Sequence, residues 1–132
     1  MNQIKFFKHC TKIGVYYDRG KLNEVLGKLA LFLSTEVTCF GSASWIRFLN
    51  TTEEDDETSG NLMDVEKKGN NVYISDLYYD GPENERKYFI ISISELIKLM
   101  NQWEKLMKEK PEEIILSEHN GKFELVGKNN SR

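Results

Sequence analysis

Residues 88–126 read YFIISISELIKLMNQWEKLMKEKPEEIILSEHNGKFELV, and this stretch decides the predicted fold. The bulky apolar run at Tyr88–Ile91 is typical of a strand that is buried on both faces. Ser92 and Glu95 follow with the spacing of a capping box, in which each side chain satisfies a free amide at the start of a helix. The sequence therefore predicts a strand that leads directly into a capped helix.

The predicted helix has a single apolar face, and a hairpin follows it. Its apolar residues recur at three- and four-residue intervals: Ile93, Leu96, Ile97, Met100, Trp103 and Met107. Lysines in the last turns suit the negative end of the helix dipole, and Pro111 then stops the helix. Asn120-Gly121 lies between the apolar runs at 114–116 and 123–126 and predicts a two-residue hairpin turn.

A second amphipathic helix is predicted over residues 21–35, with Asp18 as a possible cap. The residues on its apolar face are Leu22, Val25, Leu26, Leu29 and Leu33. The first 18 residues fit either a short helix or a short strand, followed by a loop. This helix is expected to pack on the core.

The middle of the chain is typical of strands separated by short turns. Four strands are predicted, at 44–49 (SWIRFL), 62–68, 72–79 and 86–91. Short connections between successive strands favour an antiparallel meander. The polar stretch 50–60 has no apolar anchor and is predicted to be a mobile loop.

Together these elements predict an α+β fold, with the two helices segregated against the sheet. We expect one domain over residues 1–132, containing a meander of about four strands, two amphipathic helices, a C-terminal hairpin and an irregular end at 127–132. No run approaches the roughly 20 apolar residues of a membrane span, and the N-terminus lacks the features of a secretory signal. The expected location is the cytoplasm.

The cysteine and histidine content gives little support for a metal or a disulfide. Cys10 and Cys39 are the two cysteines, and in a reducing cytosol we expect free, buried thiols. The two histidines, His9 and His119, are far apart in the sequence. A tetrahedral zinc site needs four ligands at short spacings, so none is predicted.

Charge is distributed unevenly along the chain. Between Glu53 and Glu85 there are eleven acidic residues and two lysines, which gives that segment a charge of −9, while the remainder of the chain carries +6. Such a segment attracts a cationic partner and repels nucleic acid. We therefore expect a protein partner and no nucleic-acid binding.

Motifs for catalysis are weak, and no enzyme activity or cofactor is predicted. Ser42 lies in a glycine–serine stretch that lacks the second glycine of a nucleophile elbow, and neither glycine-rich phosphate motif is present. The consecutive carboxylates at 53–57 differ from the alternating ligands of a calcium loop. They are predicted to form either a solvated loop or a partner-binding segment.

Tyrosines beside carboxylates follow the third predicted strand and are typical of protein interfaces. Tyr78 and Tyr79 would otherwise simply end that strand, one packed inward and one on the surface. The predicted partner-binding residues are Glu53, Glu54, Asp55, Asp56, Glu57, Asp76, Tyr78, Tyr79, Asp80, Glu83 and Glu85.

Part of the chain resembles the small immunity proteins that are encoded beside bacterial polymorphic toxins, including those of contact-dependent growth inhibition systems. The residues that carry the resemblance are Ile93-Ser94-Glu95-Leu96-Ile97, Gln102-Trp103-Glu104-Lys105-Leu106, Glu109-Lys110-Pro111-Glu112-Glu113-Ile114-Ile115 and Asn120-Gly121. The resemblance implies a cytoplasmic, non-enzymatic inhibitor that binds a cognate toxin tightly, often a nuclease with a basic active site. It transfers no individual binding residue.

The leading hypothesis is therefore an immunity protein that occludes the basic active site of a toxin domain, expected to be a nuclease, with an acidic surface. One alternative is a regulatory or adaptor module of a mobile element that binds another host protein. A third is a small hydrolase that uses Cys39 or Ser42 as its nucleophile.

Overall fold

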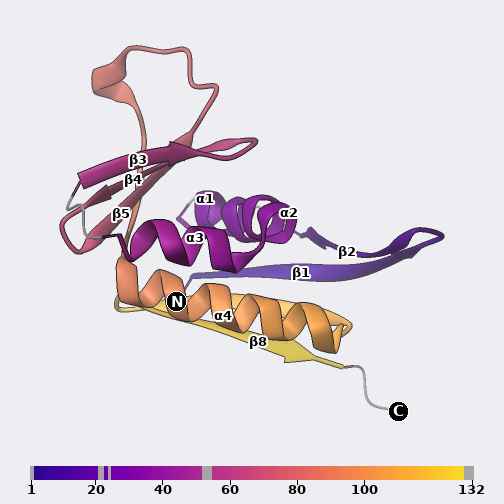
Figure 1. Ribbon diagram of the computed structural model, residues 1–132. Helices are drawn as coiled ribbons and strands as arrows, with labels where there is room; N and C mark the ends of the chain where they lie inside the picture. The colour runs from indigo at the N-terminus through magenta and orange to yellow at the C-terminus, as the bar shows by residue number, and fades with distance from the viewer. Residues whose placement is uncertain (1, 21–22, 24, 52–54, 130–132) are drawn as a thin grey trace.

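The computed structural model describes residues 2–20, 23, 25–51 and 55–129. These residues form an α+β fold with two four-stranded antiparallel sheets. Helices lie between the two sheets, and α4 (Ile93–Glu109) runs alongside β8 (Lys122–Lys128) (Figure 1). Buried side chains from both sheets and from the helices form one hydrophobic core. The predicted fold class is confirmed.

One sheet joins the two ends of the chain, in the order β2-β1-β7-β8. Its strands are β1 (Asn2–Thr11), β2 (Gly14–Arg19), β7 (Glu113–His119) and β8 (Lys122–Lys128). Asn120 and Gly121 have φ angles of 52° and 79°, and a type I′ turn requires positive φ at both positions. The predicted C-terminal hairpin is confirmed, the N-terminal segment is a strand, and β2 lies where a loop was expected.

The other sheet is a meander in the order β3-β4-β5-β6. Its strands are β3 (Asp55–Ser59), β4 (Met63–Lys68), β5 (Asn71–Asp76) and β6 (Phe89–Ser92). Gly69 supplies the positive φ, 58°, of the turn between β4 and β5. An antiparallel meander of four strands was predicted, but one of the four observed strands is not among the predicted ones.

The strand predicted at 44–49 is wrong, because this segment is helix α3 (Ser42–Leu49). Its aromatic and branched residues favour strands, but Trp45 and Leu49 lie one helical turn apart and are both buried. The backbone amide of Ser42 donates to Oε1 of Glu104 at 2.9 Å and so satisfies one free amide at the start of the helix. Tertiary contacts therefore decide the conformation of this segment.

The missing strand of the meander is β3, inside the loop predicted at 50–60. The loop prediction is wrong for residues 55–59, which pair with β4 from Asp55↔Lys68 to Ser59↔Asp64. β3 is an edge strand with exposed polar residues, so it needs little apolar character. Sequence hydrophobicity therefore gives no sign of it.

The last two strands are shorter than predicted. β5 ends at Asp76, so Tyr78 and Tyr79 lie beyond it. β6 is not buried on both faces as predicted, since Ile91 is buried but Ile90 is 52% exposed. β6 is at the edge of its sheet, and one of its faces is open to solvent.

The first helical segment runs from residue 27 to 40 and so extends beyond the predicted end at residue 35, while residues 21, 22 and 24 of the predicted helix lie outside the described residues. It consists of α1 (Gly27–Leu31), a π-helical stretch (Phe32–Val37) and α2 (Thr38–Phe40). Asp18 is not its cap, because Asp18 lies in β2. Instead, Oδ1 of Asn23 accepts hydrogen bonds from the amides of Val25 and Leu26 just before α1.

Helix α4 (Ile93–Glu109) matches the sequence prediction closely. Oγ of Ser92 accepts the amide of Glu95 at 3.2 Å, which is half of the predicted capping box, while the Glu95 carboxylate pairs with Lys98. Lys110 has a left-handed conformation just before Pro111 and ends the helix. The Trp103 ring is buried in the core, as predicted, with its centroid 5.0 Å from that of Phe6.

A buried carboxylate connects the helices to the meander. Glu36, in the π-helical stretch, is fully buried, and its carboxylate accepts the backbone amides of Asn61 at 3.0 Å and Met63 at 3.3 Å. Its carbonyl oxygen accepts the indole N–H of Trp45 at 3.3 Å. A buried charge without hydrogen bonds is very unfavourable, so these contacts fix the β3–β4 turn against the helices.

This arrangement makes the size of Gly60 critical. A Cβ at Gly60 would lie 1.7 Å from Oε2 of Glu36. Gly60→Ala must displace the buried carboxylate, so we expect the free energy of unfolding to fall by about 2 to 3 kcal/mol. Gly27→Ala is the matched control, because no atom lies within 4 Å of its Cβ, and it should be neutral or stabilising. Chemical denaturation measures both, and equal losses would contradict the proposed role of Glu36.

Candidate functional site

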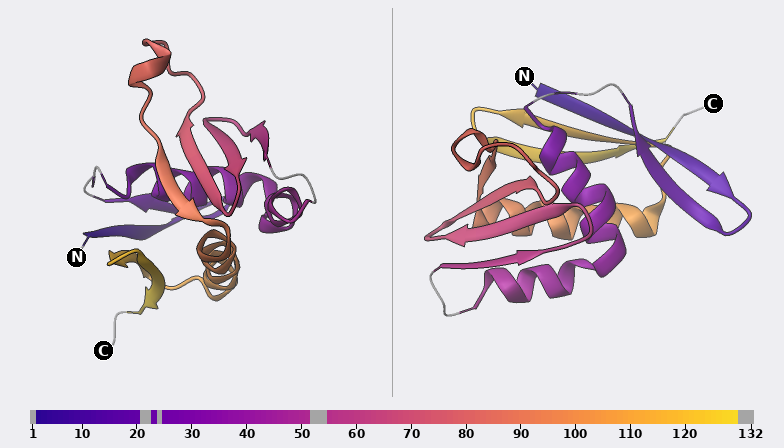
Figure 2. Two further views of the ribbon diagram at one scale, coloured as in Figure 1. Left: turned by 90° about the vertical axis from the view of Figure 1, so that its left-hand side faces the viewer. Right: turned by 90° about the horizontal axis from the view of Figure 1, so that it is seen from above.

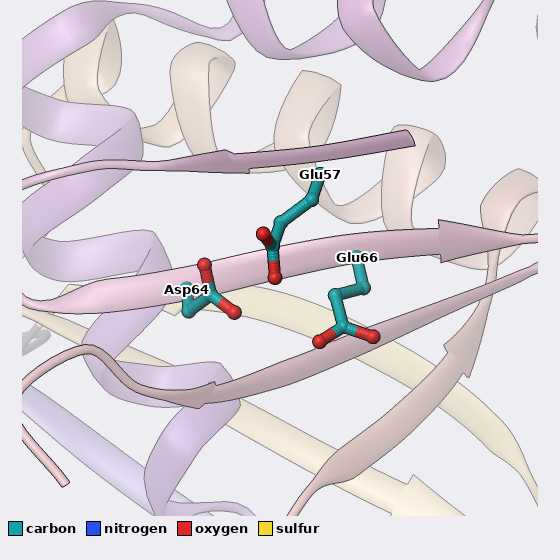
Figure 3. Close-up of side chains that lie close together, drawn as sticks. All are labelled: Glu57, Asp64 and Glu66. Carbon is teal, nitrogen blue, oxygen red and sulfur yellow. The ribbon is translucent and has the colours of Figure 1, made fainter. Parts of the chain in front are cut away.

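Three carboxylates converge on the solvent side of β3 and β4. Along β4, Met63, Val65 and Lys67 point into the protein, so Asp64 and Glu66 point outward. Glu57 of β3 pairs directly with Glu66. Figure 3 shows the three side chains turned toward one another, and one oxygen from each lies within 4.8 Å of the others. We call Glu57, Asp64 and Glu66 the acidic face.

The acidic face holds excess negative charge. A hydrogen bond with Asp64, followed by repulsion from its charge, raises the pKa of Glu57, although Glu66 and Arg86 act in the opposite direction. Nζ of Lys68 lies 3.3 Å from Glu66, and this contact raises the pKa of Lys68. Glu57 therefore takes up a proton more readily than an isolated carboxylate would.

Tyrosines border the acidic face. Tyr73 of β5 and Tyr88 have ring centroids 5.8 Å apart in an edge-on arrangement, and Nζ of Lys68 lies 5.0 Å from the Tyr73 ring. Desolvation and the nearby charges of Glu66 and Glu83 raise the pKa of the Tyr88 hydroxyl. The surface thus combines carboxylates with large, rigid aromatic rings.

Residues 77–88 form a loop that projects beyond the sheet, and we call this loop the crest (Figures 1 and 2). Arg86 holds its base. The guanidinium donates to Glu83 at 2.9 Å, to Oγ of Ser75 at 3.2 Å and to the carbonyl of Asp76 at 3.0 Å. It also lies 5.0 Å from the Tyr79 ring centroid. The crest therefore has a defined conformation despite its exposure.

The predicted partner-binding residues fall into separate groups. Tyr78, Asp80, Glu83 and Glu85 are exposed on the crest, whereas Tyr79 is half-buried against Arg86. Asp56 and Glu57 are exposed on β3, and Asp55 begins that strand. Asp76 pairs with Lys28 of α1, on the side away from the acidic face. Glu53 and Glu54 lie outside the described residues.

Asp64 and Glu66 belong to the candidate site, although the sequence prediction left them out of it. The alternation Met63-Asp64-Val65-Glu66 could have placed both carboxylates on one face of a strand. Their proximity to Glu57 depends on the pairing register of β3, a strand that was not predicted. The sequence therefore contains the signal that Asp64 and Glu66 share a face, but it contains no signal that Glu57 lies beside them.

The acidic face has some of the chemistry of a cation site. Each of its three residues offers one carboxylate oxygen, and Ca²⁺ or Mg²⁺ takes about six or more oxygens. The strands provide no further ligand from the described residues, and the cations of Lys68 and Arg86 are nearby. Among the described residues, the three carboxylates alone therefore fall short of a full coordination sphere for either ion.

The candidate nucleophiles are not paired with a base in the described part of the chain. Cys39 and Cys10 are both free and exposed, so the expectation of free thiols is confirmed and that of buried thiols is wrong. Ser42 is buried at the start of α3. His9 lies 3.9 Å from Asp18, and His119 contacts Asn120. No catalytic pair is formed among these described residues.

Comparisons with known proteins give no relative. No protein-family model matches the chain, and neither the curated proteins nor the solved structures contain a match. Among the described residues no single helix is long and apolar enough to span a membrane. Two consecutive helical segments, Gly27–Phe40 and Ser42–Leu49, reach the required length and apolar composition only when taken together, and the chain bends by 108° between them.

Repulsion within the acidic face predicts a pH-dependent stability. Because the pKa of Glu57 is raised in the folded state, its contribution to stability is complete at low pH and is lost as pH rises through that raised pKa. Glu57→Gln removes this loss, so we expect the variant to be more stable than the wild type at neutral pH by about 0.5 kcal/mol. Urea denaturation at several pH values measures the difference. Glu124→Gln, at an exposed position of β8, should show no such gain, and a destabilised Glu57→Gln would contradict the interpretation.

The role of Arg86 in the crest predicts a local effect. Arg86→Ala removes the charge-assisted hydrogen bonds to Glu83, Ser75 and Asp76, so we expect roughly tenfold faster amide exchange in residues 77–86. Hydrogen exchange followed by mass spectrometry measures this change. Lys87→Ala, at an exposed neighbouring position, should leave the exchange unchanged. Unaltered exchange in Arg86→Ala would show that other contacts hold the crest.

Proposed function

We propose that this protein is an immunity protein that neutralises a cognate bacterial toxin by covering a basic surface of the toxin. The observation that carries the proposal is the convergence of Glu57, Asp64 and Glu66 on one exposed sheet face. Like charges this close destabilise the free protein, so a cationic partner relieves the repulsion when it binds. Relief of the repulsion among these three carboxylates would therefore contribute to the free energy of binding.

The charge of this surface favours a protein partner of a particular kind. A negative field repels the phosphates of nucleic acids and attracts clusters of Lys and Arg. A nuclease carries such clusters where it binds its substrate, so the acidic face could occupy the position of the phosphate backbone. Complementary fields also speed the encounter of the two proteins, and an inhibitor of a toxin benefits from rapid association.

The crest and the bordering tyrosines supply contact area next to the charges. Tyr78 is 76% exposed, although its ring is large and apolar. Tyrosine loses little conformational entropy on binding and often anchors protein interfaces. We assign the acidic face to recognition and rapid association, and Tyr78 to slow dissociation. The toxin is expected in the cytoplasm, where the inhibitor would act.

Binding to the purified product of an adjacent toxin gene tests the proposal. Stopped-flow and surface-plasmon-resonance measurements at two salt concentrations give both rate constants. We expect Glu57→Lys and Glu66→Lys each to slow association by about tenfold and to weaken its dependence on salt. Tyr78→Ala should instead speed dissociation and leave association nearly unchanged.

The controls use exposed positions on the other sheet. Glu124→Lys makes the same change of charge on β8, and Tyr16→Ala removes a tyrosine that is 50% exposed on β2. Neither should alter either rate constant by more than about twofold, since both lie outside the proposed interface. Absence of binding, or association rates that ignore both salt and charge reversal at Glu57, would overturn the proposal.

A further inference from the structure

A second binding surface lies along the free edge of the meander. A groove with a volume of about 730 Å³ runs between β6 and α1. Val25, Leu31 and Phe89 line its apolar part, and Ile90 lines it at the strand edge. Val25 and Ile90 are 51% and 52% exposed, which is high for aliphatic side chains next to a core. The groove lies away from the acidic face, which is on β3 and β4.

The backbone of β6 is available for hydrogen bonding on this side. The amide of Ile93 donates to the carbonyl of Asn70, which makes Val72↔Ile91 and Ile74↔Phe89 the hydrogen-bonded pairs of the ladder. The N–H and C=O of Ile90 therefore point away from β5 and toward the open edge. Within the described part of the chain no group bonds to them. An open apolar edge of this kind accepts a further strand.

The charge around the groove is opposite to that of the acidic face. Of the described residues that line it, Arg19, Lys28 and Lys87 are cationic, and Asp76 is the single anionic residue. Asp76 already pairs with Lys28 at 3.9 Å. Two cations thus remain without an acidic partner in the described lining, one on each side of the groove. The occupant should therefore be acidic.

We propose that the groove binds an extended segment of a partner protein in which acidic and apolar side chains alternate, added as a further strand to β6. The backbone of the segment would pair with Ile90. Its apolar side chains would cover Val25 and Leu31, and its carboxylates would meet Arg19 and Lys87. This mode takes affinity from main-chain hydrogen bonds and specificity from the alternate side chains. The proposal does not depend on the proposed function, because it concerns another surface and the opposite charge.

Fluorescence anisotropy with a designed peptide tests the proposal on the full chain. The probe is a fluorescein-labelled peptide of about eight residues, a usual strand length, with alternating valine and glutamate. The control peptide has lysine in place of glutamate, and a single-stranded DNA oligonucleotide of equal negative charge tests whether charge alone is enough. We expect saturable binding of the glutamate peptide only. We also expect slower exchange of the Ile90 amide in the complex.

Variants then assign the binding to the groove. Lys87→Glu should weaken binding by about tenfold, whereas Lys122→Glu, at an exposed position of β8, should leave it unchanged. Ile90→Pro removes the outward N–H at an edge position where proline is tolerated, and Ile90→Val keeps that N–H. We expect the proline variant to lose binding and the valine variant to retain it. If thermal melts show that Ile90→Pro is unfolded, Lys87→Glu decides the matter.

Three results would overturn the proposal. The first is the absence of saturable binding by the glutamate peptide. The second is binding that is equally strong with the lysine peptide or with the oligonucleotide, because the groove would then lack the proposed selectivity. The third is glutamate-peptide binding that Lys87→Glu leaves intact, because the peptide would then occupy another surface.

Discussion

The buried carboxylate of Glu36 constrains much of the structure. Its two hydrogen bonds to the amides of Asn61 and Met63 place the β3–β4 turn against the π-helical stretch, and the close approach leaves room only for glycine at position 60. The bond to Met63 also sets which side of β4 faces the core. A shift of one residue would expose Met63 and Val65 and bury Asp64 and Glu66. The hydrogen bonds of Glu36 therefore support the register that places Asp64 and Glu66 on the surface.

The meander presents two surfaces of opposite character a few strands apart. Its solvent face near β3 and β4 concentrates carboxylates, while its β6 edge is apolar and flanked by cations. Arg86 and Tyr88 lie between them and connect the crest to the sheet. Neither surface is arranged for maximal stability, since one crowds like charges and the other leaves a strand edge unpaired. Such departures are typical of surfaces that are kept for binding.

The sequence predicted the fold where local signals and packing agree. Ser92, Pro111 and Asn120-Gly121 act on their own neighbours, so α4 and the last hairpin were predicted closely. The segment 44–49 was mispredicted because its composition favours strands, whereas contacts of Trp45 and Ser42 with distant residues impose a helix. The acidic face depends on the pairing of β3 with β4, and no local signal reports pairing between strands of such polar composition. The immunity function remains a proposal.

The central pairing of β1 with β7 has a consequence for synthesis. Register partners such as Ile4 and Leu116 are separated by most of the chain. The β2-β1-β7-β8 sheet is therefore completed only after β7 has left the ribosome. The meander pairs strands that follow one another in the sequence, so it can form while synthesis continues. We therefore expect the nascent chain to hold β1 paired with β2 along one edge only, while its other, partly apolar edge stays uncovered until β7 emerges. Truncation before Glu113 would leave that strand without its central partner and prone to aggregation.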